Sequence, residues 1–242
     1  MSSTVESFLN ESGPCFDVRS PKEYAHAHIP GAINLPLFSD DERAILGTLY
    51  KKEGQRAAIR LGVKLVGPKL EALMLDAEKH LQSSDYFKIY CWRGGMRSGF
   101  VCFFLQFLGY KTLQLQGGYK SFRRAILNGF SHPFHFFVLG GMTGSGKTEI
   151  LHELAGLGEQ VIDLEGIARH RGSSYGYMDA AQQPSNEQFE NELGMALRKQ
   201  DLTLPIWIED ESRMIGNCVI PNGLFQAMQQ APLVVVDCPI EE

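Results

Sequence analysis

Twice along this sequence an apolar, strand-like run ends in a glycine-containing loop that leads into a helix-like run. The first run, residues 86–90, opens into Cys91-Trp92-Arg93-Gly94-Gly95-Met96-Arg97-Ser98. The second, residues 134–139, leads to Gly141-Met142-Thr143-Gly144-Ser145-Gly146-Lys147-Thr148. Strands and helices alternate in this way through most of the chain, which predicts an α/β protein with parallel sheets.

The first loop has the composition of an anion site with a reactive thiol. Five residues, two of them glycine, separate Cys91 from Arg97. Backbone N–H groups of such a loop can surround an anion that Arg97 neutralises, and this environment lowers the pKa of a thiol. We predict that Cys91 is a catalytic nucleophile rather than a buried structural thiol. The predicted oxyanion loop consists of Arg93, Gly94, Gly95, Met96, Arg97 and Ser98.

The second loop matches the GxxxxGK[ST] pattern of phosphate-binding loops, or P-loops. In such a loop the backbone N–H groups cradle a diphosphate, Lys147 pairs with its oxygens and Thr148 reaches a magnesium ion. The predicted diphosphate site consists of Gly141, Thr143, Gly144, Ser145, Gly146, Lys147 and Thr148. Candidate metal-binding acids follow two strand-like runs, with helix caps or solvated turns as the alternative: Asp163, Glu209 and Asp210.

The length of the chain and a turn-forming segment near its middle predict two domains. At 242 residues, with 44% hydrophobic and 21% charged residues, the chain is typical of one or two globular domains. Asn128-Gly129 through His132-Pro133 is a natural linker, so we expect one domain over residues 1–130 and a P-loop domain over 134–242. The last predicted strand, 233–237, ends almost at the C-terminus, and we expect the second domain to be incomplete there.

Composition also excludes several classes of protein. The five cysteines (Cys15, Cys91, Cys102, Cys218 and Cys238) have no paired spacing that suggests disulfides or zinc. The longest apolar stretch, residues 100–108, is too short to cross a bilayer, and the N-terminus lacks the features of a signal peptide. We therefore expect a cytoplasmic protein without a membrane partner.

The net charge of −5 conceals an asymmetry. Residues 1–130 hold 17 Lys and Arg against 12 Asp and Glu, whereas residues 131–242 hold 6 against 16. One basic stretch runs from Arg43 to Lys69 and contains a single acid, Glu53. Its cations are Arg43, Lys51, Lys52, Arg56, Arg60, Lys64 and Lys69. A solvated helix face is the simpler interpretation, and contact with a phosphate backbone becomes the better one if the chemistry points to a nucleic acid.

Two segments closely resemble the rhodanese (sulfurtransferase) signature: Asp17-Val18-Arg19-Ser20-Pro21-Lys22-Glu23-Tyr24 and His28-Ile29-Pro30-Gly31-Ala32-Ile33-Asn34-Leu35-Pro36. The resemblance implies a rhodanese-like parallel-sheet domain in which Cys91 carries a persulfide and His28 belongs to the scaffold. Simple rhodaneses usually place fewer residues between the cysteine and the arginine. The spacing here resembles the Cys-x5-Arg loop of cysteine-dependent phosphatases, which is sized for a tetrahedral phosphate.

A rhodanese domain followed by a P-loop NTPase-like α/β domain resembles the tRNA 2-selenouridine synthase family. Further segments look like signatures of that family: Glu42-Arg43, Gly47-Thr48-Leu49-Tyr50-Lys51, Gly117-Gly118-Tyr119-Lys120, Asp163-Leu164-Glu165-Gly166, His170-Arg171-Gly172-Ser173-Ser174 and Glu209-Asp210-Glu211-Ser212-Arg213. The resemblance implies a transferase that converts wobble 2-thiouridine in tRNA to 2-selenouridine through S-geranyl-2-thiouridine. Its substrates would be geranyl diphosphate and selenophosphate, with Mg²⁺ as an ion at the P-loop and no tightly bound cofactor.

The same resemblance distributes these substrates over the chain. It implies selenophosphate at the Cys91 loop, geranyl diphosphate at the P-loop and tRNA on the basic stretch, with contacts from Arg43, Lys51, Lys52, Arg56 and Arg60. Two other functions fit the loops alone. One is a Cys-x5-Arg phosphatase or thiosulfate sulfurtransferase fused to an ATP-dependent kinase-like domain, and the other is a non-catalytic nucleotide-sensing or sulfur-carrier module.

Overall fold

The computed structural model describes residues 2–80, 86–142, 144–170 and 183–237. The chain divides into two compact units, Met1–Ala125 and Ile126–Glu242. The division falls within helix α7 (Gly118–Gly129), which therefore enters the segment that we expected to be a linker. Tyr119, Phe122 and Ile126 are buried at helical spacing, which keeps the helix regular across the division.

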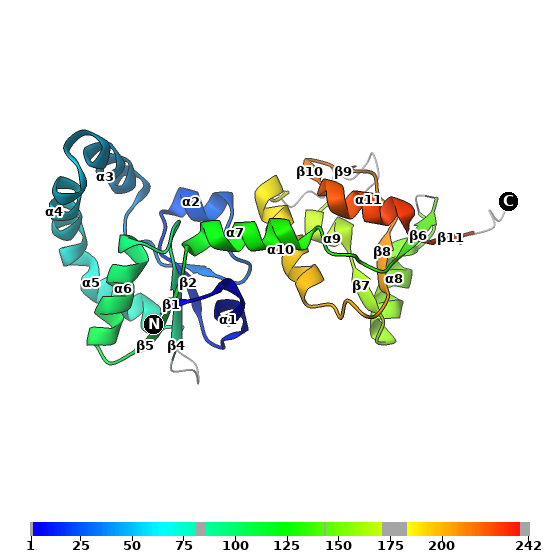
Figure 1. Cartoon of the computed structure of the whole chain (residues 1–242), viewed down its shortest axis with the longest axis horizontal. Coiled ribbons are helices and arrows are strands. Elements are labelled where there is room, and N and C mark those ends of the chain that lie inside the picture. Colours follow the sequence, from blue (N-terminus) through cyan, green and yellow to red (C-terminus); the bar gives the residue numbers. More distant parts are fainter. Residues whose placement is uncertain (1, 81–85, 143, 171–182, 238–242) are drawn as a thin grey trace. The chain divides into compact units, whose positions relative to one another are not determined.

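The first unit contains a parallel sheet of five strands in the order β1-β5-β4-β2-β3. The prediction of a parallel α/β architecture is confirmed (Figure 1). Its elements are β1 (Ser2–Ser3), α1 (Val5–Asn10), β2 (Cys15–Asp17), α2 (Pro21–His26), β3 (Ile33–Asn34), α3 (Asp40–Glu53), α4 (Gln55–Val66), η1 (Gly67–Lys69), α5 (Leu70–Glu78), β4 (Tyr86–Tyr90), α6 (Met96–Phe107), β5 (Lys111–Leu115) and the start of α7.

Helices cover both faces of this sheet, with α5 and α6 on the face opposite to α1 (Figure 1). On the α5–α6 face, Leu73, Val101 and Leu105 pack against strand residues such as Phe87 and Ile89 in one buried cluster. On the other face, Phe8 of α1 and Tyr119 of α7 contact the ring of Tyr90. The middle strand β4 is thus buried on both sides, as is typical of a parallel sheet.

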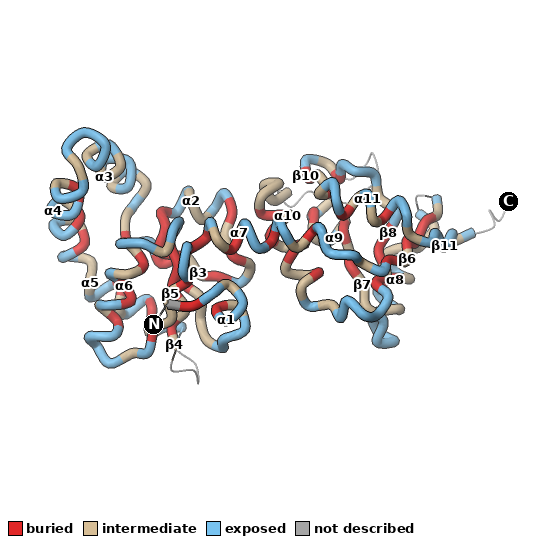
Figure 2. The backbone as a smooth tube through the Cα atoms, in the orientation of Figure 1, coloured by how far each residue is buried: buried red, intermediate tan, exposed pale blue. Residues whose placement is uncertain are grey.

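Residues 42–60, whose apolar side chains follow a helical spacing, form two helices rather than one. Two helices, α3 and α4, meet at Gly54, whose φ of 86° lies in the left-handed region that favours glycine. In α3 no residue is buried, whereas α4 buries Ala58, Gly62 and Val66 (Figure 2). The α3–α4 hairpin therefore presents α3 largely to solvent.

The second unit contains a parallel sheet in the order β11-β6-β8-β7 and a short antiparallel pair, β9 and β10. The strand predicted over 160–164 is shorter, because Asp163 caps the next helix. The elements are β6 (Phe136–Gly141), α8 (Lys147–Gly156), β7 (Gln160–Ile162), α9 (Leu164–Ala168), α10 (Asn186–Arg198), β8 (Ile206–Glu209), β9 (Met214–Ile215), β10 (Cys218–Val219), α11 (Asn222–Gln230) and β11 (Leu233–Val236).

None of the helices in the described part of the chain is long and apolar enough to cross a membrane. The described cysteines are free thiols: Cys15, Cys91, Cys102 and Cys218. Some residues that entered the predictions lie outside the described residues: Thr143, Arg171, Gly172, Ser173, Ser174 and Cys238.

Candidate functional site

Cys91 lies directly after β4, at the carboxyl end of the middle strand of the first sheet. Its side chain is buried, and its Sγ lies 3.1 Å from Oγ of Ser98 in the first turn of α6. Gln114 Nε2 donates to the same Ser98 oxygen at 2.8 Å. The single Ser98 hydroxyl proton can therefore be donated either to the Cys91 sulfur or to the carbonyl oxygen of Gly95, which is 3.3 Å away.

Glycines let the Cys91 loop pack closely against the turn that precedes α7. Gly94 and Gly118 have φ values of 62° and 61°. A Cβ atom at Gly94 would lie 2.4 Å from the carbonyl oxygen of Leu115, and one at Gly118 would lie 2.2 Å from that of Cys91. The backbone N–H of Tyr119 donates to the Cys91 carbonyl oxygen at 2.9 Å. These glycines thus fix the backbone that carries the thiol.

The rhodanese-like signature contacts this loop through a buried arginine. Arg19 forms an ion pair with Asp17 at 2.6 Å, and both side chains are inaccessible to solvent. The Arg19 guanidinium lies 4.1 Å from the ring centre of Tyr119 and 5.8 Å from that of Trp92 in the loop. A buried charge needs such a partner, so the pair is a fixed part of the scaffold around the loop.

The guanidinium of Arg97 is bound by a carboxylate of the protein itself. Its NH1 donates to Oε2 of Glu23 at 2.8 Å, and Arg43 of α3 lies 3.8 Å from Oε1 of the same carboxylate. Burial raises the pKa of Glu23, but the hydrogen bond and charge of Arg97, with Arg43, hold that pKa below its ordinary value. An anion that enters the Cys91 loop would therefore share Arg97 with Glu23.

Of the other residues that we predicted near the loop, some lie at the surface and one supports the scaffold. Arg93, Gly95 and Met96 are exposed. His28 stacks on Tyr24 with ring centroids 4.0 Å apart, and its Nδ1 lies 3.0 Å from the Tyr24 carbonyl oxygen. These contacts suit a structural role for His28.

The P-loop connects β6 to α8, and the predicted helix start at Lys147 is confirmed. Gly144 and Gly146 have φ values of 82° and 79°, which close the turn in front of the helix. Lys147 Nζ donates to the carbonyl oxygens of Gly141 and Met142 at 3.0 and 3.2 Å. The ammonium group therefore lies over the loop, where a phosphate would replace these carbonyls as its partner.

Three glutamates gather near this loop. Glu209 is the buried last residue of β8, Glu211 follows two residues later, and Glu165 lies in the first turn of α9. Their carboxylate oxygens lie within 4.8 Å of one another, and Glu209 accepts the backbone N–H of Glu165 at 2.6 Å. Thus β8 and α9 bring together acids that are far apart in the sequence.

The predicted acids are only partly in this cluster. Glu209 belongs to it, whereas Asp163 accepts the backbone N–H of Gly166 at 2.7 Å and serves as the N-cap of α9. Asp210 is exposed. For Asp163 the structure thus shows the helix cap that was the alternative interpretation.

The charge of Lys147 in the P-loop acts on Glu211, so the glutamate cluster lies close enough to that loop to interact with it. Burial raises the pKa of Glu209 to about 8, against the hydrogen bond from Glu165. Burial and then the hydrogen bond and charge of Glu165 raise the pKa of Glu211 to about 7, while the charge of Lys147 opposes this rise. Carboxylate oxygens with the Thr148 hydroxyl are the donor set that Mg²⁺ prefers, so these residues fit a magnesium ion.

The basic stretch lies on the α3–α4 hairpin. Six of its cations are exposed: Arg43, Lys51, Lys52, Arg56, Arg60 and Lys64. Arg43 is near Glu23, and Lys69 forms an ion pair with Glu42. The hairpin therefore carries exposed positive charge on two consecutive helices rather than on one.

The structure adds residues that spacing along the chain did not reveal. Glu23 and Glu165 belong to the two sites through partners that are 44 or more positions away in the sequence. The Ser20-x-x-Glu23 spacing signals the start of α2, where the Ser20 N–H donates to Glu23 at 3.1 Å. That signal identifies a helix cap and gives no indication of the ion pair with Arg97.

The fold and the two loops define a rhodanese-like domain joined to a P-loop domain. Residues 3–125 match the rhodanese-like domain family, and residues 134–242 match the tRNA 2-selenouridine synthase AAA domain. The chain belongs to the tRNA 2-selenouridine synthase family.

Curated relatives named tRNA 2-selenouridine synthase resemble nearly the whole chain. The protein of Aeromonas salmonicida (strain A449) is 44% identical over 95% of this chain and 62% of its own length. That of Hahella chejuensis (strain KCTC 2396) is 40% identical over 98% and 64%, and that of Pseudomonas putida (strain GB-1) is 42% identical over 91% and 60%. The chain thus spans a little over three fifths of the length of the relatives that it matches.

One solved structure is also similar. It is the crystal structure of the N-terminal domain of a Clostridium difficile 630 protein named for ATP/GTP binding. Its sequence is 41% identical, its TM-score is 0.50, and the match covers 52% of this chain and 99% of that one.

Proposed function

We propose that this chain carries the rhodanese and P-loop parts of a tRNA 2-selenouridine synthase. Such a transferase converts wobble 2-thiouridine in tRNA to 2-selenouridine through S-geranyl-2-thiouridine. The observation that carries the proposal is the occurrence of the Cys91 loop and the Lys147 loop together, in domains that match this family. Exchange of sulfur for selenium by way of an alkylated intermediate requires both an alkyl-diphosphate site and a site for the selenium donor.

The P-loop would bind geranyl diphosphate as the alkyl donor. The thiouridine sulfur attacks the allylic carbon, and the bond from that carbon to the diphosphate oxygen breaks. Negative charge then grows on the departing diphosphate, where Lys147 and the loop N–H groups stabilise it. A magnesium ion held by Thr148 and the glutamate cluster would add positive charge at the same oxygens.

The Cys91 loop would handle selenium. Selenophosphate is an anion, and Arg97 with Arg93 supplies positive charge for it beside the thiol. Because alkylation turns the sulfur at C2 into a leaving group, the selenium of selenophosphate can attack C2, the C2–S bond breaks and geranyl thiol leaves. Water then cleaves the P–Se bond, which gives 2-selenouridine and inorganic phosphate. The pairing of Arg97 with Glu23 supports this role, since the guanidinium already binds an oxyanion beside the loop.

Transfer RNA would bind through the exposed cations of the α3–α4 hairpin: Arg43, Lys51, Lys52, Arg56 and Arg60. Contacts of this kind neutralise backbone phosphates and position the nucleic acid without reading its sequence. A cytoplasmic location would suit both a tRNA substrate and the free thiols.

The test is mass spectrometry of nucleosides from tRNA treated with this chain, first with geranyl diphosphate and then with selenophosphate. We expect S-geranyl-2-thiouridine after the first addition and 2-selenouridine after the second, with a full-length relative as the positive control. Turnover of thiosulfate or of a phenyl phosphate ester, with the nucleosides unchanged, would instead support the phosphatase or sulfurtransferase. Nucleotide binding with no turnover would support the sensing or carrier module.

A further inference from the structure

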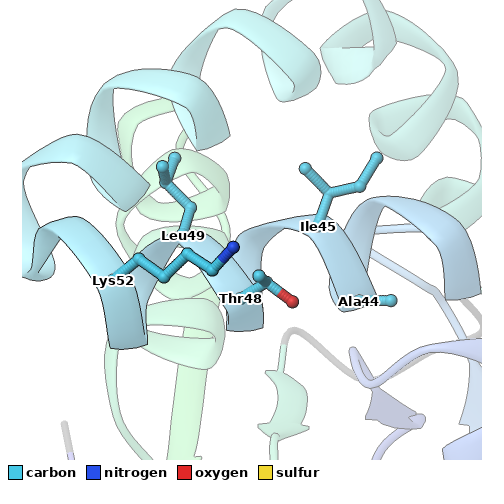
Figure 3. A pocket seen from close by; sticks show the side chains of 5 residues that line it. All are labelled: Ala44, Ile45, Thr48, Leu49 and Lys52. Atoms are coloured by element: carbon cyan, nitrogen blue, oxygen red, sulfur yellow. The ribbon is translucent and has the colours of Figure 1, made fainter.

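Helix α3 carries an open pocket of about 380 Å³. The residues that line it repeat along one side of the helix: Ala44, Ile45, Thr48, Leu49 and Lys52. Figure 3 shows the alkyl stem of Lys52 lying along α3, so that its ammonium group ends beside Thr48. The pocket therefore combines an apolar wall with a single positive charge.

The fold does not use this wall for its core. No residue of α3 is buried, and the side chain of Ile45 is 56% exposed. Exposed apolar side chains that are scattered singly need no explanation, but here the exposed Ala44 and Ile45 line one pocket together with the half-buried Leu49. An apolar pocket with one polar group at its edge is the usual form of a small-molecule site.

Contacts on either side of the pocket lead from the α3–α4 hairpin to the start of α6. Before the pocket, Arg43 contacts Glu23, which accepts a hydrogen bond from Arg97. After it, Gln55 Nε2 lies 3.4 Å from the sulfur of Met96. Met96 and Arg97 are the first two residues of α6 and directly follow the Cys91 loop. The helix that carries the pocket therefore begins near the carboxylate that binds Arg97, and the hairpin contacts the first residue of α6.

Charge and polarity define what such a pocket would bind. Lys52 and the neighbouring exposed cations Lys51 and Arg56 suit the phosphates of a nucleic acid. The apolar wall does not suit a phosphate or a bare nucleobase edge, and requires a hydrocarbon group. An occupant that satisfies both is a nucleotide that carries an apolar substituent.

We propose that this pocket binds the isoprenoid chain of S-geranylated 2-thiouridine in tRNA while the modified base faces the Cys91 loop. Lys52 pairs with a nearby phosphate of the same tRNA. This inference rests on the proposed function, because that function supplies the geranylated nucleoside. It assigns the α3 pocket to recognition of the intermediate, so that selenium transfer is directed to alkylated rather than unalkylated thiouridine.

The test compares two tRNA samples that differ only at the wobble sulfur, one with 2-thiouridine and one geranylated chemically in advance. The dissociation constant of each is measured for the wild-type chain and for Ile45→Asn. We expect the wild type to prefer geranylated tRNA, and Ile45→Asn to reduce this preference about tenfold without changing the affinity for 2-thiouridine tRNA. The matched control is Ile59→Asn, which alters an exposed isoleucine of α4 outside the pocket and should keep the preference.

A second variant, Ala44→Phe, fills the pocket without adding a polar group and should also abolish the preference while the circular dichroism spectrum stays unchanged. Equal preference in the wild type and both pocket variants would overturn the proposal, as would a wild type that binds the two tRNAs equally. A change of molecular mass in sedimentation for Ile45→Asn would assign this surface to contact between copies of the chain instead. Preference without selenium transfer in the nucleoside assay would leave the pocket assignment standing and overturn the proposed function.

Discussion

Among single residues, Cys91 and Arg97 are the pair to which we assign the chemistry of the first site, and each is held by specific partners. The Ser98 hydroxyl lies within hydrogen-bonding distance of the Cys91 sulfur, and Gly118 allows the N–H of Tyr119 to reach the Cys91 carbonyl oxygen. Backbone contacts of this kind do not depend on the side chain at position 91. Substitutions there should therefore remove the thiol chemistry and leave the loop in place.

We expect Cys91→Ala to lower selenium incorporation into tRNA by about 10³-fold or more, because the variant lacks the thiol that we assign to the selenium step. S-geranylation should remain at the wild-type level, since we assign it to the P-loop. Nucleoside mass spectrometry measures both products. The matched control is Cys102→Ala, which removes a second buried thiol and should keep both steps. Full selenation by Cys91→Ala would show that the thiol has no part in the transfer.

Glu23→Gln should weaken the contacts of α2 with Arg97 and Arg43 and lower stability at neutral pH by up to about 1 kcal/mol. The pKa of Glu23 is depressed in the folded protein, so the stability that it contributes is present above its ordinary pKa of 4.5. That contribution disappears as pH falls through the lower, folded pKa. Urea denaturation at pH 7 and at pH 3.5 should show a larger difference between variant and wild type at pH 7, and an equal difference at both would contradict the assignment.

At the scale of elements, the α3–α4 hairpin combines exposed positive charge with little buried surface. Its break at Gly54 places Lys51 and Lys52 at the end of one helix and Arg56 at the start of the next. Three cations therefore lie around a single turn. A compact cluster of this kind suits a bent phosphate backbone better than a straight helix face would.

Reversal of Lys51, Lys52 and Arg56 to Glu should weaken tRNA binding. When the logarithm of the affinity is plotted against the logarithm of the salt concentration, the slope should become shallower. The change should be nearly one for each phosphate that the protein no longer neutralises. Binding of geranyl diphosphate should be unchanged. Filter binding at several salt concentrations provides the measurement, and reversal of the exposed Lys79 and Lys111 serves as the control. An unchanged affinity and slope would return the hairpin to the interpretation of a solvated surface.

The glutamate cluster between β8 and α9 predicts an unusual pH dependence. Folding raises the pKa of Glu209 from 4.5 to about 8, so the folded state keeps a proton that the unfolded state releases. Stability should then fall as pH rises from 4.5 to 8. In EDTA, Glu209→Gln should melt above the wild type at pH 8, by about 2–4 °C for each kcal/mol that the wild type loses as its buried carboxyl ionises, and at the same temperature at pH 4.5. If the melting temperatures of Glu209→Gln and the wild type differ by the same amount at both pH values, the Glu209 carboxyl does not cause the pH dependence of stability.

The sequence pattern predicted the helices and strands whose limits depend on neighbouring residues in the chain. The strand–loop–helix units around Cys91 and Lys147 follow from apolar runs that end at glycines, and β4, α6, β6 and α8 are present in the structure. Helices α10 and α11 were not predicted. In α10 the buried face includes Gln188 and Asn191, so polar residues interrupt the apolar pattern that identifies a helix.

At the scale of the whole molecule, the pairs that complete each site could not be read from spacing. Arg97 and Glu23 are 74 positions apart, and Glu165 and Glu209 are 44 apart. Such pairs form only after parallel strands place the ends of distant segments at one edge of a sheet. The sequence therefore predicted both loops and the presence of acids near the P-loop. Which of these acids lie together is determined by the fold.

The central claim is that two loops in one chain divide the reaction, with alkylation at the P-loop and selenium transfer at the Cys91 loop. Lys147→Ala separates the two steps, because it removes the cation that stabilises the departing diphosphate and leaves the first unit unaltered. Geranylation of 2-thiouridine tRNA should then fall by about 10²-fold or more. No 2-selenouridine should form from that tRNA, because its precursor is absent.

The most direct measurement is therefore selenium incorporation by Lys147→Ala into tRNA that was geranylated in advance. The control is the same variant supplied with 2-thiouridine tRNA and geranyl diphosphate. We expect 2-selenouridine from the geranylated tRNA at a rate close to that of the wild type, and none from the control. If folded Lys147→Ala fails on geranylated tRNA as well, the two loops do not act as separate sites and the account is wrong.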